Sequence, residues 1–201
     1  MSKGLLFVLS GPSGVGKNTV LDELFKKFNG VSYSVSATTR ERRSGEVEGE
    51  NYFFISEEKF KEIEENDGFI ESALVHGHHY GTPKKFVDQK LAEGEDIILE
   101  IDTQGAKQVR EKYPEAVYIF LLPPSLEELE NRLDKRGSES DKSKNVRLSN
   151  ARQELKEVHN YDYEVINDSL ADAVREIKKI IIKEQKRRDS KWLLNPLQNN
   201  W

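Results

Sequence analysis

The sequence predicts an α/β fold with a mostly parallel sheet flanked by helices. Three observations lead to this prediction. A continuous apolar run at residues 5–9 is followed directly by a glycine-rich loop and then by a segment with helical spacing of apolar residues. Apolar strand candidates alternate with helical stretches along much of the remaining chain, an order typical of α/β folds. Two segments that depart from this alternation predict insertions into the core.

The first strand candidate, residues 5–9, is apolar at every position and ends at Ser10-Gly11-Pro12. A continuous apolar run of this length is typical of a strand that is buried on both faces. The helix that follows is predicted from apolar residues at helical spacing between Val20 and Phe28, and Asn29-Gly30 supplies its stop signal. The order is therefore strand, glycine loop, helix.

Three further strands are predicted at residues 96–101, 117–122 and 163–166. Each precedes a helical stretch, of which the amphipathic segment at residues 170–186 is one. These repeats of strand and helix complete the predicted parallel sheet.

Two inserted segments have a different character. Residues 32–80 carry strand signals at 52–55 and 69–75 around a charged helix candidate at 57–65, and we interpret them as a small β-rich subdomain. Residues 132–152 contain a small, polar stretch with helical patterns on both sides, which is typical of a mobile flap.

The composition limits the classes of protein and site. The 201 residues suffice for one domain, or one core with small insertions. A net charge of −5 gives no overall basic field, so we expect small-molecule substrates, and neither nucleic acid nor a membrane as partner. The absence of cysteine excludes disulfides, thiolate zinc sites and cysteine catalysis. The run at 5–9 is too short for a signal peptide or a membrane span, and we expect a soluble, cytoplasmic protein.

The loop after the first strand has the arrangement Gly-x-x-x-x-Gly-Lys. In such loops, backbone N–H groups turn toward phosphate oxygens, the helix N-terminus adds favourable potential, and the lysine reaches the outer phosphates. The alternative is a glycine-rich turn with an incidental lysine, but the strand before the loop and the helix after it favour phosphate binding. The predicted nucleotide-binding residues, here called the donor loop, are Gly11, Pro12, Ser13, Gly14, Val15, Gly16, Lys17, Asn18 and Thr19.

Asn18 departs from the usual pattern, in which Ser or Thr follows the lysine and its hydroxyl binds Mg²⁺. An amide oxygen can still meet a hard cation or a bound water, but metal placement then depends more on carboxylates elsewhere. Glu100 and Asp102 are the candidates, because they lie at the carboxyl end of a predicted strand, where α/β folds bind ligands. The alternative is that both are solvent-facing acids.

Three of the four histidines, His76, His78 and His79, lie close together in the sequence. No matching pattern of carboxylates accompanies them, so we expect a surface loop and not a metal site.

A second group of cations lies between residues 36 and 54. Arg40, Arg42 and Arg43 occur there among hydroxyls and beside Tyr52 in an otherwise acidic chain. Arginine matches phosphate oxygens through two parallel hydrogen bonds, and a tyrosine can add a directed O–H. From this stretch alone, a phosphate-binding site and a solvated run of charges remain equally open.

Taken together, these motifs resemble those of guanylate kinase, the family of enzymes that phosphorylate GMP from ATP. The resemblance covers residues 4–188 and keeps the motifs in the same order. Besides the donor loop, it rests on Ser-Ala-Thr-Thr-Arg at 36–40, Gly-Glu-x-x-Gly-x-x-Tyr-x-Phe at 45–54, Phe-Ile-Glu at 69–71, Tyr-Gly-Thr at 80–82, Glu-Ile-Asp-Thr-Gln-Gly at 100–105, Pro-Pro-Ser at 123–125, Arg132 with Arg136-Gly137, and Ile-Asn-Asp at 166–168.

The resemblance implies a P-loop NTPase-like core with a small GMP-binding subdomain and a helical lid. It implies Mg²⁺-dependent phosphoryl transfer from ATP to GMP, giving ADP and GDP, in purine nucleotide metabolism and GMP recycling. It also implies an acceptor cluster, in which one group binds the GMP phosphate and the other binds the guanine ring. The residues implied to bind the phosphate are Arg40, Arg43, Tyr52 and Tyr80. Those implied to bind guanine, here called the guanine group, are Ser36, Glu71, Thr82 and Asp102.

Among the guanine group, Glu71 is the expected specificity residue. Guanine presents N1–H and an exocyclic amine, two donors that one carboxylate can accept together, whereas adenine offers no such pair. A site built for these donors rejects a base that lacks them, because its own acceptor is then left unpaired. Without the resemblance, Glu71 would be interpreted as an ordinary acid at a strand end.

For the transferring phosphoryl group, the resemblance implies several cations. Phosphoryl transfer depends on positioning and charge neutralisation more than on covalent help. The alternative for the arginines of the lid is a solvated basic helix face. The implied catalytic residues are Lys17, Arg40, Arg132, Arg136 and Arg147, and the residues implied near adenine are Asn167 and Asp168.

Two other classes of function stay open. A protein-interaction module can keep this fold without catalysis, but the intact Lys17 and glycines argue against it. A related P-loop kinase for another acceptor should lack the set Ser36, Glu71 and Thr82.

We expect a single domain at residues 1–201. Its core comprises 1–33, 83–124 and 153–188, and the GMP-binding subdomain, the lid and the C-terminal tail comprise 34–82, 125–152 and 189–201. The oligomeric state stays open, with a homodimer among the alternatives.

Overall fold

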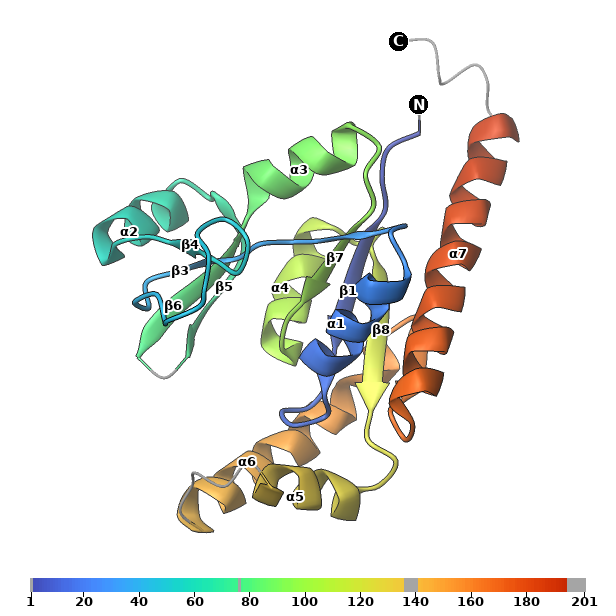
Figure 1. The fold of residues 1–201 in the computed structure, drawn as a ribbon. Helices are drawn as coiled ribbons and strands as arrows, with labels where there is room; N and C mark the ends of the chain where they lie inside the picture. The colour runs from blue at the N-terminus through green and yellow to red at the C-terminus, as the bar shows by residue number, and fades with distance from the viewer. Residues whose placement is uncertain (1, 76, 136–140, 195–201) are drawn as a thin grey trace.

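The computed structural model describes residues 2–75, 77–135 and 141–194, without the side chains of residues 133–135, 141–147 and 193. Figure 1 shows a central sheet with helices around it, a second sheet to one side, and two helices that extend below both. The predicted α/β fold with a parallel sheet is confirmed.

The central sheet has five strands in the order β2-β7-β1-β8-β9, and all its neighbouring pairs are parallel. The strands β8 and β9 lie where the sequence predicts them, whereas β1 is displaced by one residue and β7 is shorter at both ends. The short edge strand β2 has no counterpart among the predictions. The strands are β1 (Leu6–Ser10), β2 (Ser32–Tyr33), β7 (Ile97–Glu100), β8 (Val117–Leu122) and β9 (Tyr163–Ile166).

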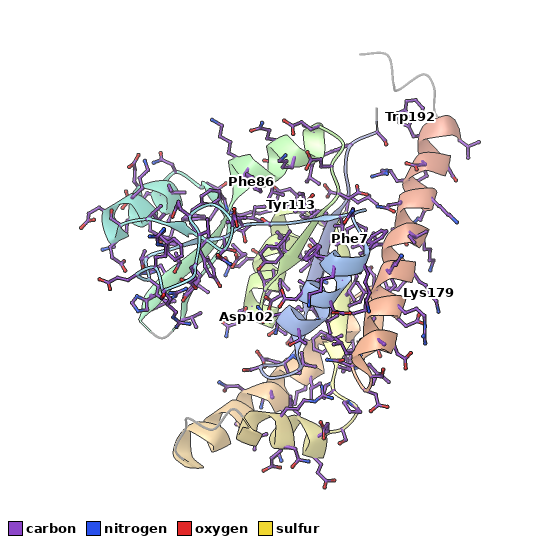
Figure 2. The ribbon with its side chains drawn as sticks, viewed as in Figure 1. Phe7, Phe86, Asp102, Tyr113, Lys179 and Trp192 are labelled. Carbon is purple, nitrogen blue, oxygen red and sulfur yellow. The ribbon has the colours of Figure 1, made fainter. Side chains whose placement is uncertain are left out.

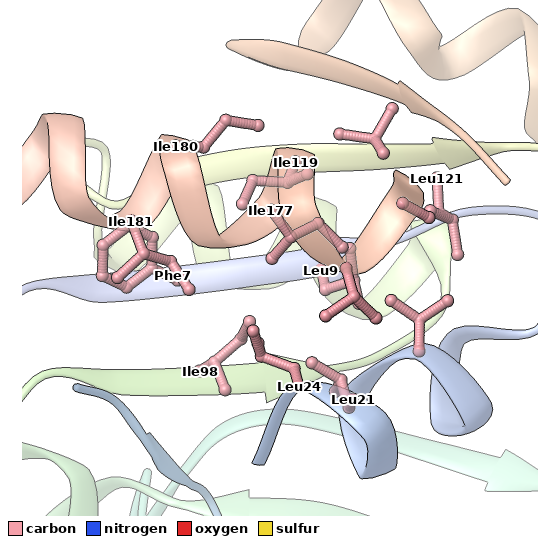
Figure 3. Packing of buried hydrophobic residues seen from close by; sticks show 14 of the residues in the cluster. Phe7, Leu9, Leu21, Leu24, Ile98, Ile119, Leu121, Ile177, Ile180 and Ile181 are labelled. Atoms are coloured by element: carbon pink, nitrogen blue, oxygen red, sulfur yellow. The ribbon is translucent and has the colours of Figure 1, made fainter. Parts of the chain in front are cut away.

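Four helices pack on the two faces of this sheet, and β1 is buried at every position. Phe7 and Leu9 point toward α1 and α7, as Figure 3 shows, while Leu6 and Val8 belong to the core that α3 and α4 cover. This alternation explains the continuous apolar run, because both faces of the strand are covered. The helices are α1 (Lys17–Lys27), α3 (Lys84–Ala92), α4 (Thr103–Lys112) and α7 (Leu170–Leu194).

The second sheet has the order β4-β3-β6-β5. Its core contains the stacked rings of Phe60 and Phe69, whose centroids lie 4.4 Å apart. Helix α2 (Glu57–Glu65) covers it, and its N-cap is Ser56, whose hydroxyl accepts the N–H of Lys59. The strands are β3 (Ala37–Thr38), β4 (Phe53–Phe54), β5 (Phe69–Val75) and β6 (His78–Pro83).

The prediction of a surface loop at the histidines is wrong for His78 and His79, which lie on β6. The ring of His79 packs 5.0 Å from that of Phe60, so apolar packing holds this segment in the sheet. His76 lies outside the described residues.

Between β8 and β9, the chain forms the helices α5 (Leu126–Lys135) and α6 (Asp141–Glu154) and the 3₁₀ helix η1 (Leu155–Asn160). The small polar stretch predicted as a flap falls largely on residues 136–140, which lie outside the described residues. What the structure describes of this segment is helical.

Helix α7 continues to Leu194, eight residues beyond the predicted end at residue 186. In the added turns, Arg188 forms a long-range ion pair with Asp96. Just before them, Gln185 donates to Gly30 O and to Asp96. Trp192 therefore lies on this helix, near the upper end of α7 in Figure 2. In the part of the chain that the structure describes, no helix is both long and apolar enough to cross a membrane.

Candidate functional site

The donor loop, Asp102, the lid and Asn167 all follow strands of the parallel sheet. Parallel strands end at the same edge, so β1, β7, β8 and β9 bring these four segments to one side of the molecule. Figure 2 shows Asp102 at the lower end of α4. This edge is the candidate functional site.

The donor loop owes its shape to glycine. Gly11 and Gly16 have φ angles of 149° and 98°, in a region that L-residues rarely adopt. A Cβ atom at Gly11 would also lie 2.3 Å from the carbonyl oxygen of Leu121. The side chain of Lys17 returns over the loop, and its Nζ donates to Gly11 O at 2.8 Å. The glycine dihedrals therefore set the shape of the loop, and the Lys17 amine lies against its backbone.

Two side chains from distant elements hold the carbonyl oxygen of Val15 from behind the loop. Asn167 donates from Nδ2 to Val15 O at 2.8 Å, and Arg132 donates from Nη1 to the same oxygen at 3.4 Å. Arg132 also donates to Asn167 O at 3.0 Å and, through Nε, to Glu128 at 3.0 Å. Asn167 is buried, with 7% of its surface exposed. In this structure, both residues support the backbone of the donor loop.

The sequence gives no signal for Glu154, the last residue of α6. Its carboxylate accepts the backbone N–H of Ser13 at 3.1 Å. A carboxylate at the end of α6 therefore occupies one of the N–H groups that the glycine loop presents. The two residues are 141 positions apart, so no local pattern could have paired them.

Asn18 and Glu100 lie together beside the donor loop. Asn18 donates from Nδ2 to Glu100 Oε2 at 2.8 Å. Burial raises the pKa of Glu100, and the nearby Lys17 opposes that shift. The amide oxygen of Asn18 and the two predicted carboxylates are hard oxygen donors, which suit Mg²⁺. Among the residues that the structure describes, no group of three or more His, Cys, Asp or Glu is arranged to hold a metal.

Among the residues of the acceptor cluster that are predicted to bind the GMP phosphate, Arg40 lies between aromatic rings and a carboxylate. Its guanidinium carbon is 5.5 Å from the centroid of Tyr52, and the rings of Tyr52 and Tyr80 lie 5.8 Å apart. Glu46 accepts both terminal nitrogens of Arg40, at 2.7 and 3.1 Å, and also the backbone N–H of Arg43 at 2.8 Å. Glu46 is thus a further residue of this cluster, and it occupies the fork that would bind a phosphate.

Arg43 itself is exposed, and only its backbone takes part in the contacts described above. Arg42, also exposed, lies beside it on the same loop. Neither side chain is brought into the cluster in this structure.

The guanine group surrounds a buried carboxylate. Thr82 donates its hydroxyl to Glu71 Oε1 at 2.6 Å, and both side chains are buried. Burial raises the pKa of Glu71 to about 7; the hydrogen bonds from Thr82 lower it, and the charge of Asp102 raises it. A Cβ atom at Gly105 would lie 3.1 Å from Glu71 Oε2 and 3.5 Å from Asp102 Oδ1. The absence of a side chain at Gly105 therefore leaves room for both carboxylates.

Asp102 has a structural role as well. It is the N-cap of α4, and its Oδ1 accepts the N–H of Gly105 at 2.7 Å. Ser36, the fourth member of the guanine group, is half-buried and accepts the backbone N–H of Phe53 through its own carbonyl oxygen.

A cavity of about 370 Å³ lies between α1 and the loop that carries Tyr52. Its lining includes Asn18 and Glu100 on the donor side and Glu46 and Tyr52 on the acceptor side. The two clusters therefore face one space.

The remaining predicted residues are placed only in part. Arg136 lies outside the described residues, as does the side chain of Arg147, whose backbone belongs to α6. Asp168 follows Asn167 in the turn before α7 and is exposed.

The chain is similar to known proteins over most of its length. A family model described as Guanylate kinase matches residues 3–184. A curated guanylate kinase of Caldanaerobacter subterraneus subsp. tengcongensis is 54% identical over 187 residues, which are 93% of this chain and 91% of that protein. One of Clostridium tetani is 52% identical over 190 residues, 94% of this chain and 90% of that protein. The crystal structure of guanylate kinase from Anaplasma phagocytophilum superposes with a TM-score of 0.73 and 36% identity, covering 92% of this chain and 87% of that one.

Proposed function

We propose that this chain, which belongs to the guanylate kinase family, transfers the terminal phosphoryl group of ATP to GMP, giving ADP and GDP. The observation that carries the proposal is the buried carboxylate of Glu71 beside Asp102, at the edge of the sheet where the donor loop lies. A phosphate loop alone supports only a nucleotide binder. The buried carboxylate of Glu71, with the half-buried Asp102 near it, adds an acceptor for the donors of guanine.

On the donor side, the backbone of the glycine loop binds the phosphates of ATP, and Lys17 neutralises charge on the phosphoryl group in transfer. The contact of Lys17 with Gly11 O holds the amine at the mouth of the loop before the nucleotide arrives. The phosphates displace Glu154 from the N–H of Ser13, because both anions seek the same donor.

On the acceptor side, Arg40, Tyr52 and Tyr80 bind the phosphate of GMP, with Arg43 reaching it as the exposed loop closes. That phosphate displaces the Glu46 carboxylate from the guanidinium of Arg40. Glu71, Asp102, Ser36 and Thr82 bind the guanine ring, and Glu71 accepts its N1–H and exocyclic amine. No general base is needed, because the attacking group is already a phosphate oxygen.

We propose Mg²⁺ as the cofactor that enters with ATP. The oxygens of Asn18, Glu100 and Asp102 are the donors of this chain that can meet it directly or through water. When bound, the ion neutralises charge on the transferring phosphates. Because Asn18 turns its amide nitrogen to Glu100, its oxygen is the atom left for the ion or its water shell.

The lid completes the site in this proposal. Arg136 and Arg147 supply cations over the transferring phosphoryl group, and Arg132 holds the loop to which they close. Asn167 and Asp168 lie near the adenine. The residue ranges predicted for the core, the acceptor subdomain, the lid and the tail, and a cytoplasmic location, belong to the same proposal.

An assay coupled to ADP release tests the substrate assignment. The purified chain receives ATP and Mg²⁺ with GMP, AMP, UMP or CMP in separate reactions. Turnover with GMP, exceeding that with AMP by at least about 100-fold, is the expected result, because a site built to bind a donor rejects an analogue that lacks it. Turnover with AMP and none with GMP would overturn the assignment, and no turnover with any of the four would favour an interaction module.

A further inference from the structure

We infer that Gln108 is a positioning residue for guanine recognition: its side-chain amide clamps the backbone beside Glu71 and fixes that carboxylate against helix α4. This inference rests on the proposed function, because it concerns how Glu71 meets the base. It concerns a residue that neither touches a reacting group nor belongs to the acceptor cluster.

Gln108 makes a pair of hydrogen bonds to one residue of β5. Its Oε1 accepts the N–H of Ser72 at 3.0 Å, and its Nε2 donates to Ser72 O at 3.0 Å. A primary amide that bonds both backbone groups of one residue acts as a neighbouring strand would act. Since β5 is an edge strand of the second sheet, Gln108 takes the place of a strand partner at this point.

The clamp lies beside an irregularity in β5. Phe69 pairs with Pro83 and Ser72 pairs with Gly81, so β5 contains one more residue than β6 between these two pairs. Such a β-bulge disrupts the ladder locally and re-aims a side chain. Glu71 lies within the bulge, directly before Ser72, so its direction depends on how the backbone there is held.

A second side chain of α4 supports the same strand at the other end of the bulge. Lys112, one helical turn after Gln108, donates from Nζ to Phe69 O at 2.8 Å and to Asp67 at 2.6 Å. The outward backbone groups at both ends of the bulge are thus held by α4. Of these two side chains, Gln108 is the uncharged one, and it contacts the residue next to Glu71.

Helix α4 also carries two residues that lie close to the Glu71 carboxylate. Asp102 caps the helix, and Gly105 leaves the space into which Glu71 Oε2 fits. Gly105 and Gln108 are three residues apart and so lie on the same face. By tying β5 to this face, Gln108 sets the separation of the Glu71 and Asp102 carboxylates, although Glu71 lies on the second sheet and Asp102 follows a strand of the central sheet.

Two variants separate this role from a purely structural one. Gln108→Met keeps the length of the side chain and removes both hydrogen bonds, and Gln108→Glu keeps the acceptor for Ser72 N–H but sets a carboxylate against Ser72 O. Glu111→Gln, an exposed position on the same helix, is the matched control. The readouts are kcat and KM for GMP, for IMP, which lacks the exocyclic amine, and for ATP, together with the melting temperature.

The inference predicts that Gln108→Met raises KM for GMP about tenfold and lowers the ratio of kcat/KM for GMP over IMP by a similar factor, because a displaced acceptor loses discrimination. KM for ATP should stay within about twofold in the same variant, since the donor loop is untouched. Gln108→Glu should show the same loss of GMP over IMP preference, and it serves as the test if the methionine variant does not fold. Glu111→Gln should match the parent.

The outcomes are distinguishable. A wild-type chain that does not phosphorylate GMP overturns the proposed function and this inference with it. A wild-type chain that phosphorylates GMP, with an unchanged GMP over IMP ratio in both Gln108 variants, overturns the inference alone and makes Gln108 a residue of strand stability only.

Discussion

The donor loop and the acceptor cluster differ in how they are held before substrates arrive. The donor loop is shaped by glycine dihedrals and by contacts to its own backbone, with Lys17 on Gly11 O and Asn167 on Val15 O. The acceptor cluster is built from side chains of separate strands and loops, and its Arg40 fork is occupied by Glu46. The shape of the donor loop is therefore formed in advance, although its substrate must displace the Glu154 carboxylate from Ser13 N–H. The acceptor site must instead give up an ion pair of the arginine that binds its substrate.

This difference separates two ways of binding phosphate. A loop of backbone N–H groups binds an anion without losing side-chain entropy, because its shape is fixed by folding. An arginine paired with a carboxylate binds an anion only by giving up that pair. This lowers the affinity for the substrate, but it also lowers the affinity for anions that do not belong in the site. The variants that follow break one site while leaving the other intact.

The largest effect is expected for Lys17→Ala. Lys17 belongs to the donor loop and neutralises charge on the phosphoryl group in transfer, so kcat should fall by about 10²–10³. KM for GMP should change by less than about threefold, because the acceptor cluster is untouched. Steady-state kinetics with each substrate varied in turn measure both values. A rise in the GMP KM as large as the fall in kcat would mean that the two sites are not separate.

A smaller effect is expected for Asn167→Leu. The change removes the hydrogen bond to Val15 O and leaves a buried carbonyl with only the longer contact from Arg132. A lost hydrogen bond to a buried acceptor costs about 1–3 kcal/mol, so the Kd for ADP should rise about tenfold. Calorimetric titration with ADP measures it, and Glu164→Gln at an exposed position of β9 is the control. An unchanged ADP affinity would remove Asn167 from the support of the loop.

The smallest effect is expected for Glu46→Gln, and this variant should bind its substrate more tightly, whereas the other two lose function. The amide can still accept the N–H of Arg43, but it competes less strongly for the Arg40 fork. Because solvent screens a partly exposed ion pair, the gain is small, and the Kd for GMP should fall about threefold. Titration of GMP without ATP measures it, with Glu48→Gln on the same loop for comparison. A weaker affinity for GMP would show that Glu46 positions Arg40 in the complex as well.

Local patterns in the sequence predict the donor half of this protein well. The apolar runs predict β8 and β9 at their observed bounds, and the glycine spacing predicts the loop, because strand burial and phosphate binding both depend on neighbouring residues. The extension of α7 to Leu194 has no such local signal, because its added turns are held by the ion pair of Arg188 with Asp96, which spans the chain.

The acceptor half is less predictable because distance in sequence hides its partners. The resemblance to a known family supplies Glu71 and Thr82, whose side chains the structure joins. The supporting residues Gln108 and Glu154 leave no local signal, since each acts through a contact that appears only when strands and helices pack.

The role proposed for the acceptor site depends most on Glu71. Its carboxylate, with a pKa of about 7, must be ionised to accept two donors from guanine. Ionised Glu71 binds GMP and protonated Glu71 does not, so affinity falls as the pH drops through 7. One pH unit below the pKa only about one molecule in eleven is ionised, and the Kd for GMP should therefore rise about tenfold between pH 8 and pH 6.

The decisive measurement is the Kd for GMP from pH 6 to pH 8 in the wild-type chain and in Glu71→Gln. The phosphate of GMP also titrates near pH 6, and the variant, which has no ionisable group at this position, subtracts that contribution. The account predicts a steep pH dependence in the wild-type chain, a shallow one in the variant, and weaker binding by the variant at pH 8. Parallel pH profiles with equal affinity at pH 8 would contradict it, because Glu71 would then take no part in binding guanine.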